Sequence, residues 1–205
     1  MSLRCLSRIP RPPGRLIVRP AGPTDHDAIR EVVRAAYQQY EPVTGPELFS
    51  RYIADLLDFE RHSRHGQLIV ADLDGTVLGS GAFYPDVSAQ GVGWPRGWAG
   101  GRALAVHPEA RGHGVAQALL AAAECLARHH GAPVFALHTA SFMQTAIALY
   151  DRLGYRRAPE FDRDLGAFFG LDDRATFCSI AYVRDLETDL SSGTGSADEM
   201  RLVSR

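Results

Sequence analysis

The chain has 205 residues, of which 45% are hydrophobic and 22% charged, the composition of an ordinary folded domain rather than of a disordered or fibrous protein. Its 22 basic and 24 acidic side chains leave a formal charge of −2, which gives no electrostatic reason to expect nucleic acid or an anionic membrane as a partner. Three cysteines without CxxC spacing indicate neither a disulfide framework nor a zinc site, and no apolar run is long enough to span a membrane. We therefore expect a cytoplasmic protein.

The two ends of the chain differ from its middle in composition. Residues 1–14 contain three arginines, three prolines and no acid, so we expect a flexible extension rather than an amphipathic targeting helix. Residues 187–205 begin with the small, polar stretch ETDLSSGTGSADEM, which predicts a disordered tail. One domain is therefore predicted over residues 15–186.

The first half of that domain predicts a strand, two helices and a hairpin. The run RLIVR, residues 15–19, is typical of a short strand, and it ends at Pro20. Two β-rich runs within QLIVADLDGTVLGSGAFYP are joined by Asp74-Gly75, which is a strong hairpin signal. Between the strand and the hairpin, on either side of the break EPVTGP, apolar residues recur at helical spacing: Ile29, Val32, Val33, Ala36 and Tyr37 before it, and Leu48, Tyr52, Ile53 and Leu56 after it.

The second half predicts alternating strands and helices. A Gly-rich loop leads to a strand at 101–107, a helix from about 113 to 130, a strand at 133–139, and a helix at 142–153 that ends at Gly154. A final strand is predicted at 175–184, whereas 155–174 gives no clear element. The crossover from 101 to 139 requires parallel strands and the hairpin requires antiparallel ones, so we predict a mixed α/β sheet with helices on both faces.

The stretch LAVHPEARGHGVAQALL, residues 104–120, passes from a strand to a helix through two glycines, Gly112 and Gly114. A glycine inside a helix costs about 0.5–1 kcal/mol relative to alanine, so this pair needs a reason. Glycines ahead of a helix let a diphosphate lie against free backbone N–H groups, and Arg111 would add positive charge. A dinucleotide fingerprint would need a third glycine and a Walker loop would need Lys-Ser or Lys-Thr, and both are missing. The sequence therefore predicts a phosphate cradle of another kind.

The segment Arg111-Gly112-His113-Gly114-Val115-Ala116 resembles the [QR]-x-x-G-x-[GA] motif of the GNAT superfamily of N-acetyltransferases. The later stretch AIALYDRLGYRR, residues 146–157, resembles the second signature of that family, on the following helix. Both signatures and the order of elements extend the resemblance over residues 15–186. It implies the fold of an acyl-CoA N-acyltransferase, an α/β fold with a mixed, mostly antiparallel sheet of six to seven strands and helices on both faces.

The resemblance also implies a site for acetyl-CoA, as co-substrate and without a metal, between the strands at 101–107 and 133–139. Backbone N–H groups of 111–116 would hold the pyrophosphate, and the backbone of Leu104 and Val106 would pair with the pantetheine arm. The N–H of Leu104 would stabilise the developing oxyanion, and Tyr150 would protonate the departing thiolate. The implied cofactor-binding residues are Leu104, Ala105, Val106, Arg111, Gly112, His113, Gly114, Val115 and Ala116.

Tyr150 has a second interpretation, because Ala146, Ile147, Tyr150 and Leu153 form an apolar helical stripe that is typical of a core. Tyr150→Phe separates the two roles.

The chain departs from the family pattern at Met143, where an asparagine often contacts the pantetheine. That hydrogen bond is either absent or supplied by Gln144. An amine acceptor also needs a base, and the candidates are Glu41, Asp86 and His138, the last with a purely structural role as its alternative.

The predicted function is that of an N-acetyltransferase, which transfers the acetyl group of acetyl-CoA to a primary amine by direct attack. The acceptor is a small-molecule or a peptide amine, and Trp94 and Trp98 either wall its pocket or cover the sheet edge. Because of Met143 and the lack of an obvious base, a non-catalytic acyl-CoA-binding or regulatory module on the same fold is the alternative. The acyl donor and a homodimer, which is common among relatives, stay open.

Overall fold

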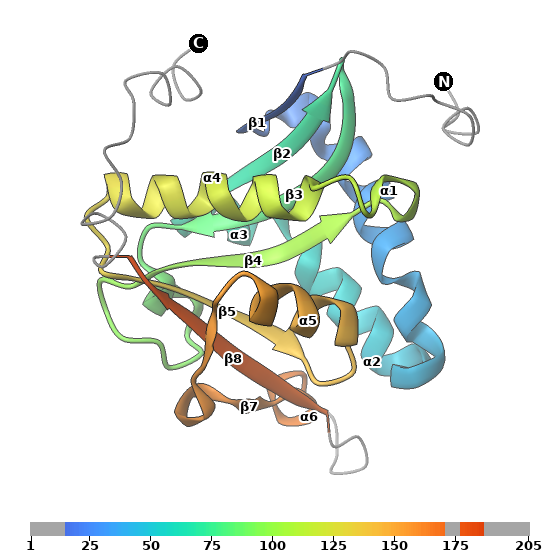
Figure 1. Cartoon of the computed structure of the whole chain (residues 1–205). Coiled ribbons are helices and arrows are strands. Elements are labelled where there is room, and N and C mark those ends of the chain that lie inside the picture. Colours follow the sequence, from blue (N-terminus) through green and yellow to red (C-terminus); the bar gives the residue numbers. More distant parts are fainter. Residues whose placement is uncertain (1–14, 171–176, 187–205) are drawn as a thin grey trace.

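The computed structural model describes residues 15–170 and 177–186, so the predicted extension at 1–14 and tail at 187–205 lie outside the described residues. One sheet runs through the molecule in the order β1-β2-β3-β4-β5-β8-β6, with β7 also paired to β8 (Figure 1). No helix of the described part combines the length and apolarity needed to cross a membrane. The strands are β1 (Leu16–Pro20), β2 (Gln67–Leu73), β3 (Thr76–Tyr84), β4 (Ala99–Val106), β5 (Val134–Ala140), β6 (Arg156–Arg157), β7 (Arg163–Asp164) and β8 (Cys178–Asp185). The helices are α1 (His26–Tyr37), α2 (Glu41–Leu56), α3 (Phe59–His65), α4 (Val115–His129), α5 (Gln144–Arg152) and α6 (Leu165–Phe168).

The predicted fold class is confirmed, since the sheet is mixed and mostly antiparallel. Among the described strands, β4 and β5 form the parallel pair, and the other neighbours run antiparallel. The sheet has eight strands rather than six or seven, because residues 155–174, which showed no clear pattern, add β6 and β7 of two residues each. The short helix α3 was also not predicted, since FERHSRH has no apolar period.

Helices cover both faces of the sheet, with α4 and α5 in front and α1 to α3 behind in Figure 1. The strands in the middle are therefore buried on both faces, and successive residues belong to different cores. In β2, Leu68 and Val70 pack in the core that contains residues of α1, α2 and α3. Ile69 and Ala71 pack in the core beneath α4. The near-continuous apolar run of β2 follows from this double burial.

The sheet opens between β4 and β5. The two strands pair only over Ala99–Gly101 and Phe135–Leu137, and residues 102–106 of β4 have no partner in β5. On its other side β4 bulges, because Gly81 of β3 opposes both Ala103 and Leu104 of β4 between the pairs Ser80–Ala105 and Ala82–Arg102. Ala103, inside the bulge, has φ +54°, which few residues other than glycine adopt. Just where β5 turns away, β4 therefore presents an irregular and unpaired edge.

Candidate active site

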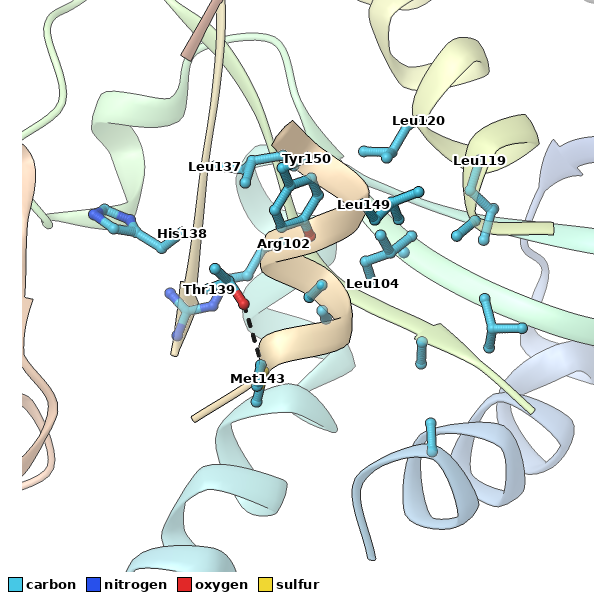
Figure 2. A pocket seen from close by; sticks show the side chains of 18 of the residues that line it. Arg102, Leu104, Leu119, Leu120, Leu137, His138, Thr139, Met143, Leu149 and Tyr150 are labelled. Carbon is cyan, nitrogen blue, oxygen red and sulfur yellow. Dashed lines mark hydrogen bonds between the residues drawn. The ribbon is translucent and has the colours of Figure 1, made fainter. Parts of the chain in front are cut away.

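A cavity of about 720 Å³ lies where β4 and β5 separate. It is bounded by both strands, by α5, by the first half of α4, by the ends of α1 and α2, and by segments near residues 90 and 163–169. Figure 2 shows side chains that line it from four elements: Leu104 from β4, Leu119 and Leu120 from α4, Leu137 and His138 from β5, and Tyr150 from α5, with the ring of His138 directed away from that of Tyr150.

The two glycines at the start of α4 are explained by their backbone angles. Gly112 and Gly114 have φ of +79° and +80°, and Gly114 is the residue that precedes the helix. A Cβ at Gly112 would meet nothing within 4 Å, so the requirement is conformational rather than steric. Hydrogen bonding in α4 begins with the N–H of Ala118 to the carbonyl of Gly114 at 2.9 Å, which leaves the earlier N–H groups without helical partners. The cavity is lined by these glycines and by the first turn of α4.

Two residues of the predicted cradle have side chains engaged elsewhere. The guanidinium of Arg111 donates to the carbonyl of Ala36 at 3.0 Å and lies 3.4 Å from the amide oxygen of Gln39, at the end of α1. Arg111 still lines the cavity, but part of its charge faces the C-terminal carbonyls of a helix. The His113 ring nitrogen lies 2.9 Å from the carbonyl of Arg111, and His113 is the one residue of 111–116 that does not line the cavity.

Leu104 sits at the centre of the bulge on β4. It has no register partner in β3 or in β5, although it lines the cavity. Its carbonyl accepts a 3.0 Å hydrogen bond from the hydroxyl of Tyr37, which is buried on α1. Helical periodicity placed Tyr37 in the core but gave no sign of this contact. Ala105 and Val106 pair with Ser80 and Gly79 of β3, and both line the cavity.

Tyr150 lies in the core and also borders the cavity. The side chain is buried, with ring centroids 5.6 Å from Tyr155 and 5.6 Å from Tyr182, and it also points into the cavity from α5 (Figure 2). Burial raises the pKa of the phenol, and the nearby tyrosines add to that effect, so the hydroxyl stays protonated. Within the described part of the chain the hydroxyl has no hydrogen-bond partner, which leaves it available to a ligand.

Met143, immediately before α5, occupies the position at which the family often has an asparagine. Met143 is buried, and its sulfur accepts from the hydroxyl of Thr139 at 3.6 Å (Figure 2). Gln144 lines the cavity, but its amide donates to the carbonyl of Ser141 at 2.8 Å. Its amide nitrogen is thus already used at the beginning of the helix.

Of the three candidate bases, the structure brings only His138 to the cavity. Glu41 accepts from the side chain of Gln38 and does not line the cavity. Asp86 accepts from the N–H of Ser88 at 3.0 Å, and its hydrogen bonds with Ser88 lower the pKa of its carboxyl. Asp86 therefore caps the helical turn at Val87–Gln90 and lies outside the cavity lining.

His138 is held in one tautomer when neutral. Its Nε2 lies 2.9 Å from the carbonyl oxygen of Phe161, and because a carbonyl only accepts, Nε2 carries the proton and Nδ1 keeps a lone pair. Burial lowers the pKa of the ring, the Phe161 carbonyl opposes this, and the charges of Arg102 and Arg163 lower it further. The imidazole is therefore neutral at pH 7.

Of the two tryptophans of the Gly-rich loop, Trp94 packs against His138 and Trp98 packs against Trp94 and Phe161, and neither lines the cavity. Trp94 is buried, with its ring centroid 4.5 Å from that of His138, 4.8 Å from Phe161 and 6.1 Å from Trp98. Of the two roles predicted for them, covering the sheet fits these contacts. Among the described residues, no group of three or more His, Cys, Asp or Glu side chains could hold a metal ion.

Comparison with known proteins bears on the same region. A family model described as "Acetyltransferase (GNAT) family" matches residues 27–155, which include the cradle, both strands and Tyr150. No curated protein sequence matches the chain.

Solved structures of similar fold cover most of the chain. The PaiA N-acetyltransferase of Thermoplasma acidophilum, in complex with coenzyme A, is 15% identical, with a TM-score of 0.62 over 83% of this chain and 99% of that one. The ribosomal-protein-S18-alanine N-acetyltransferase of Escherichia coli is 15% identical, with a TM-score of 0.59 over 89% and 98%. A GNAT family acetyltransferase of Brucella melitensis, in complex with acetyl-CoA, is 26% identical, with a TM-score of 0.51 over 69% and 83%.

Proposed function

The chain belongs to the acetyltransferase (GNAT) family, and we propose that it transfers the acetyl group of acetyl-CoA to a primary amine by direct attack of the amine on the thioester. The observation that carries this proposal is the cavity itself. It joins the unpaired edge of β4 to the glycine-bounded N-terminus of α4, and Tyr150 points into it. Similar folds in complex with coenzyme A or acetyl-CoA support the choice of donor.

The residues present fit acetyl-CoA. Free N–H groups at the start of α4, beside Gly112 and Gly114, suit a pyrophosphate. Residues 102–106 of β4 lack a partner on the side of β5, so their backbone groups suit the amides of the pantetheine arm. When bound, acetyl-CoA supplies an activated thioester carbonyl.

Leu104 is the proposed oxyanion-stabilising residue of the reaction. Its N–H would stabilise the negative charge that develops on the thioester oxygen, and loss of one such donor costs about 2.7–4 kcal/mol of transition-state stabilisation. The Tyr37 hydroxyl fixes the same residue through its carbonyl oxygen. Because the donor is a backbone group, the identity of the side chain matters little beyond packing.

Tyr150 is the proposed acid that protonates the departing thiolate. Its raised pKa keeps the phenol protonated, and desolvation in the same cavity raises the basicity of the thiolate as well. His138 is the proposed base for the amine, through the Nδ1 lone pair that the Phe161 carbonyl leaves free. Its lowered pKa keeps that lone pair available at neutral pH.

Thiol release from acetyl-CoA, measured across a panel of amines, tests the proposal. A blank without amine is needed, because Cys125 is exposed and reacts with the same thiol reagent. Amine-dependent release with formation of the acetylated product supports the transferase. Calorimetric binding of coenzyme A without release for any amine would instead favour the non-catalytic acyl-CoA-binding module. Absence of coenzyme A binding by folded protein would contradict both functions.

A further inference from the structure

The charged side chains that line the cavity have one sign. Among the described residues, its lining includes Arg102, Arg111, Arg152 and Arg163 but no aspartate or glutamate. Arg111 precedes α4 and Arg152 ends α5, and the phosphates of acetyl-CoA account for positive charge near the cradle. Arg102 and Arg163 come instead from β4 and β7, so the proposed donor does not explain them.

The charge of Arg102 is only half compensated. It donates to the carboxylate of Asp55, but that carboxylate also binds Arg61 at 2.6 Å, so one acid faces two guanidinium groups. The side chain of Arg102 is 16% exposed, which makes an excess charge costly without a partner. Within the described part of the chain its Nε and Nη1 groups make no hydrogen bond. In Figure 2 its guanidinium lies toward β5, on the side from which His138 projects.

Arg163 has no acidic partner among the described residues. Its Nε donates to the carbonyl of Val92 at 3.1 Å and its Nη1 to the carbonyl of Asp162 at 2.8 Å. The carboxylate of Asp162 is itself bound to Arg157 at 2.8 Å. At Gly93, where φ is +84°, a Cβ would lie 2.2 Å from Nη2 of Arg163, so the guanidinium packs directly against this loop. Arg163 is thus positioned by backbone groups while its charge stays uncompensated.

One further donor in the cavity lining also lacks an acceptor. The amide nitrogen of Gln90 is buried without a hydrogen-bond partner among the described residues, and Gln90 lines the cavity. Apolar side chains form the remaining wall, namely Tyr52, Leu56, Val92, Leu165 and Phe169. This half of the cavity therefore combines an apolar surface with positive charge and spare donors.

We infer that the acceptor is a small amine that carries a carboxylate and an apolar body, as an apolar amino acid does, with the carboxylate bound by Arg102 and Arg163. The role of this amine as acceptor rests on the proposed function, whereas the carboxylate-binding site does not. A guanidinium presents parallel N–H donors that match a carboxylate. A polyamine would be repelled by the same charges, and an arylalkylamine, which has no carboxylate, would leave the excess positive charge uncompensated.

The first test compares four L-amino acids, phenylalanine, leucine, methionine and tryptophan, with their carboxamides as acceptors. The amine of a carboxamide is the weaker base, so more of it is unprotonated at neutral pH, and chemistry alone favours the amide. We expect kcat/KM to be at least tenfold higher for at least one acid than for its amide. If every amide reacts as well as its acid, the transferase function stands and the inference is wrong.

The second test removes the charge of Arg163 with Arg163→Gln. We expect KM for the preferred acid to rise at least tenfold, with KM for acetyl-CoA and for the amide unchanged. Arg64→Gln is the control, since Arg64 lies on α3 in an exposed pair with Glu60 at 3.2 Å. Equal KM changes for acid and amide would assign Arg163 a structural role and overturn the inference.

A binding measurement tests the carboxylate site even if the protein does not catalyse acetyl transfer. The same acids and amides are titrated calorimetrically into protein saturated with coenzyme A. Binding of an acid but not of its amide, without turnover, would support the carboxylate site and contradict the transferase. If none of the four acids binds more tightly than its amide and none is preferred in turnover, the inference is overturned.

Discussion

The hydroxyl of Tyr37 on α1 donates a 3.0 Å hydrogen bond to the carbonyl oxygen of Leu104, 67 residues away in the bulge of β4. Tyr37 is buried, and burial raises the pKa of its phenol well above the usual range, so the hydroxyl is a permanent donor. The bulged residue that lacks strand partners is therefore held from the helix behind the sheet.

Replacement of this tyrosine should affect catalysis as well as stability. We expect Tyr37→Phe to lower the free energy of unfolding by about 0.5–1.5 kcal/mol, because one buried hydrogen bond is lost. We also expect kcat to fall by about tenfold, since the Leu104 backbone is less firmly positioned. Tyr84→Phe is the control: it removes another tyrosine hydroxyl, 2.6 Å from Nδ1 of His62 and outside the cavity lining. Urea denaturation and steady-state kinetics should show lost stability in both variants but lower kcat only in Tyr37→Phe, and equal kcat values would contradict the positioning role.

Tyr150→Phe distinguishes the proposed acid from a core residue. The ring contacts with Tyr155 and Tyr182 are kept, so we expect the melting temperature to change little. Loss of a general acid should lower kcat by about 10²–10⁴-fold at unchanged KM for acetyl-CoA. Tyr182→Phe is the matched control, because it removes a neighbouring hydroxyl that bonds to Asp151 at 3.0 Å and does not line the cavity. A normal kcat for Tyr150→Phe would remove this residue from the mechanism.

A matched substitution distinguishes the proposed phosphate-binding role of Gly112 from the effect of its backbone conformation on stability. Gly112 and Gly131 have φ of +79° and +70°, and a Cβ at either would meet nothing within 4 Å. We expect Gly112→Ala and Gly131→Ala each to lose about 1–2 kcal/mol of stability, because alanine disfavours the left-handed region. Only Gly112 lines the cavity, so calorimetry should show weaker coenzyme A binding for Gly112→Ala alone. Equal affinities in the two variants would argue against a phosphate site at this loop.

The buried His62 and the half-buried His138 predict how stability varies with pH. Burial lowers the pKa of His62 and of His138 from the ordinary value of 6.5. Below pH 6.5 the unfolded chain then binds more protons than the folded one, so stability should fall as the pH drops from 7 toward 5. Each histidine contributes at most about 1.4 kcal/mol per pH unit.

Urea unfolding at pH 7.5, 6.5 and 5.5 measures this slope. His62 is fully buried between the Tyr84 hydroxyl and the carbonyl of Asp55, and His62→Gln should flatten the slope while it lowers stability at every pH. A wild-type stability that does not change over this range would show that the two rings titrate alike in both states.

Much of the fold was predictable because its helices and turns are encoded by patterns that extend over only a few residues. The stripe from Ile29 to Tyr37 and the Asp74-Gly75 turn are encoded over a few residues, and both predictions are confirmed. The seven residues of α3 carry no apolar period, and their start is marked only by Asp58, whose side chain accepts from the N–H of Arg61. The short strands β6 and β7 form because they pair with β8, and local sequence patterns do not encode pairing between distant segments.

The candidate site was predictable where it depends on one segment. The glycines at 112 and 114 marked the loop before α4, although the sequence explained them by close approach of a phosphate and not by their positive φ. Ala103 adopts φ +54° because of the pairing with β3, which its residue type does not indicate. The sequence could not rank Glu41, Asp86 and His138, since only tertiary packing decides which of them reaches the cavity. Arg163 was missed because it lies in the segment that showed no pattern.

The parallel ladder between β4 and β5 is only three residue pairs long, although it joins the first half of the sheet to the second. A molecule seated in the opening would bridge the two halves, and a ligand that binds only folded protein adds about 2.7 kcal/mol at a hundredfold excess over its Kd. Chains deprived of coenzyme should therefore be degraded by proteases faster than loaded ones. The cellular lifetime of this protein would then follow the supply of its own co-substrate.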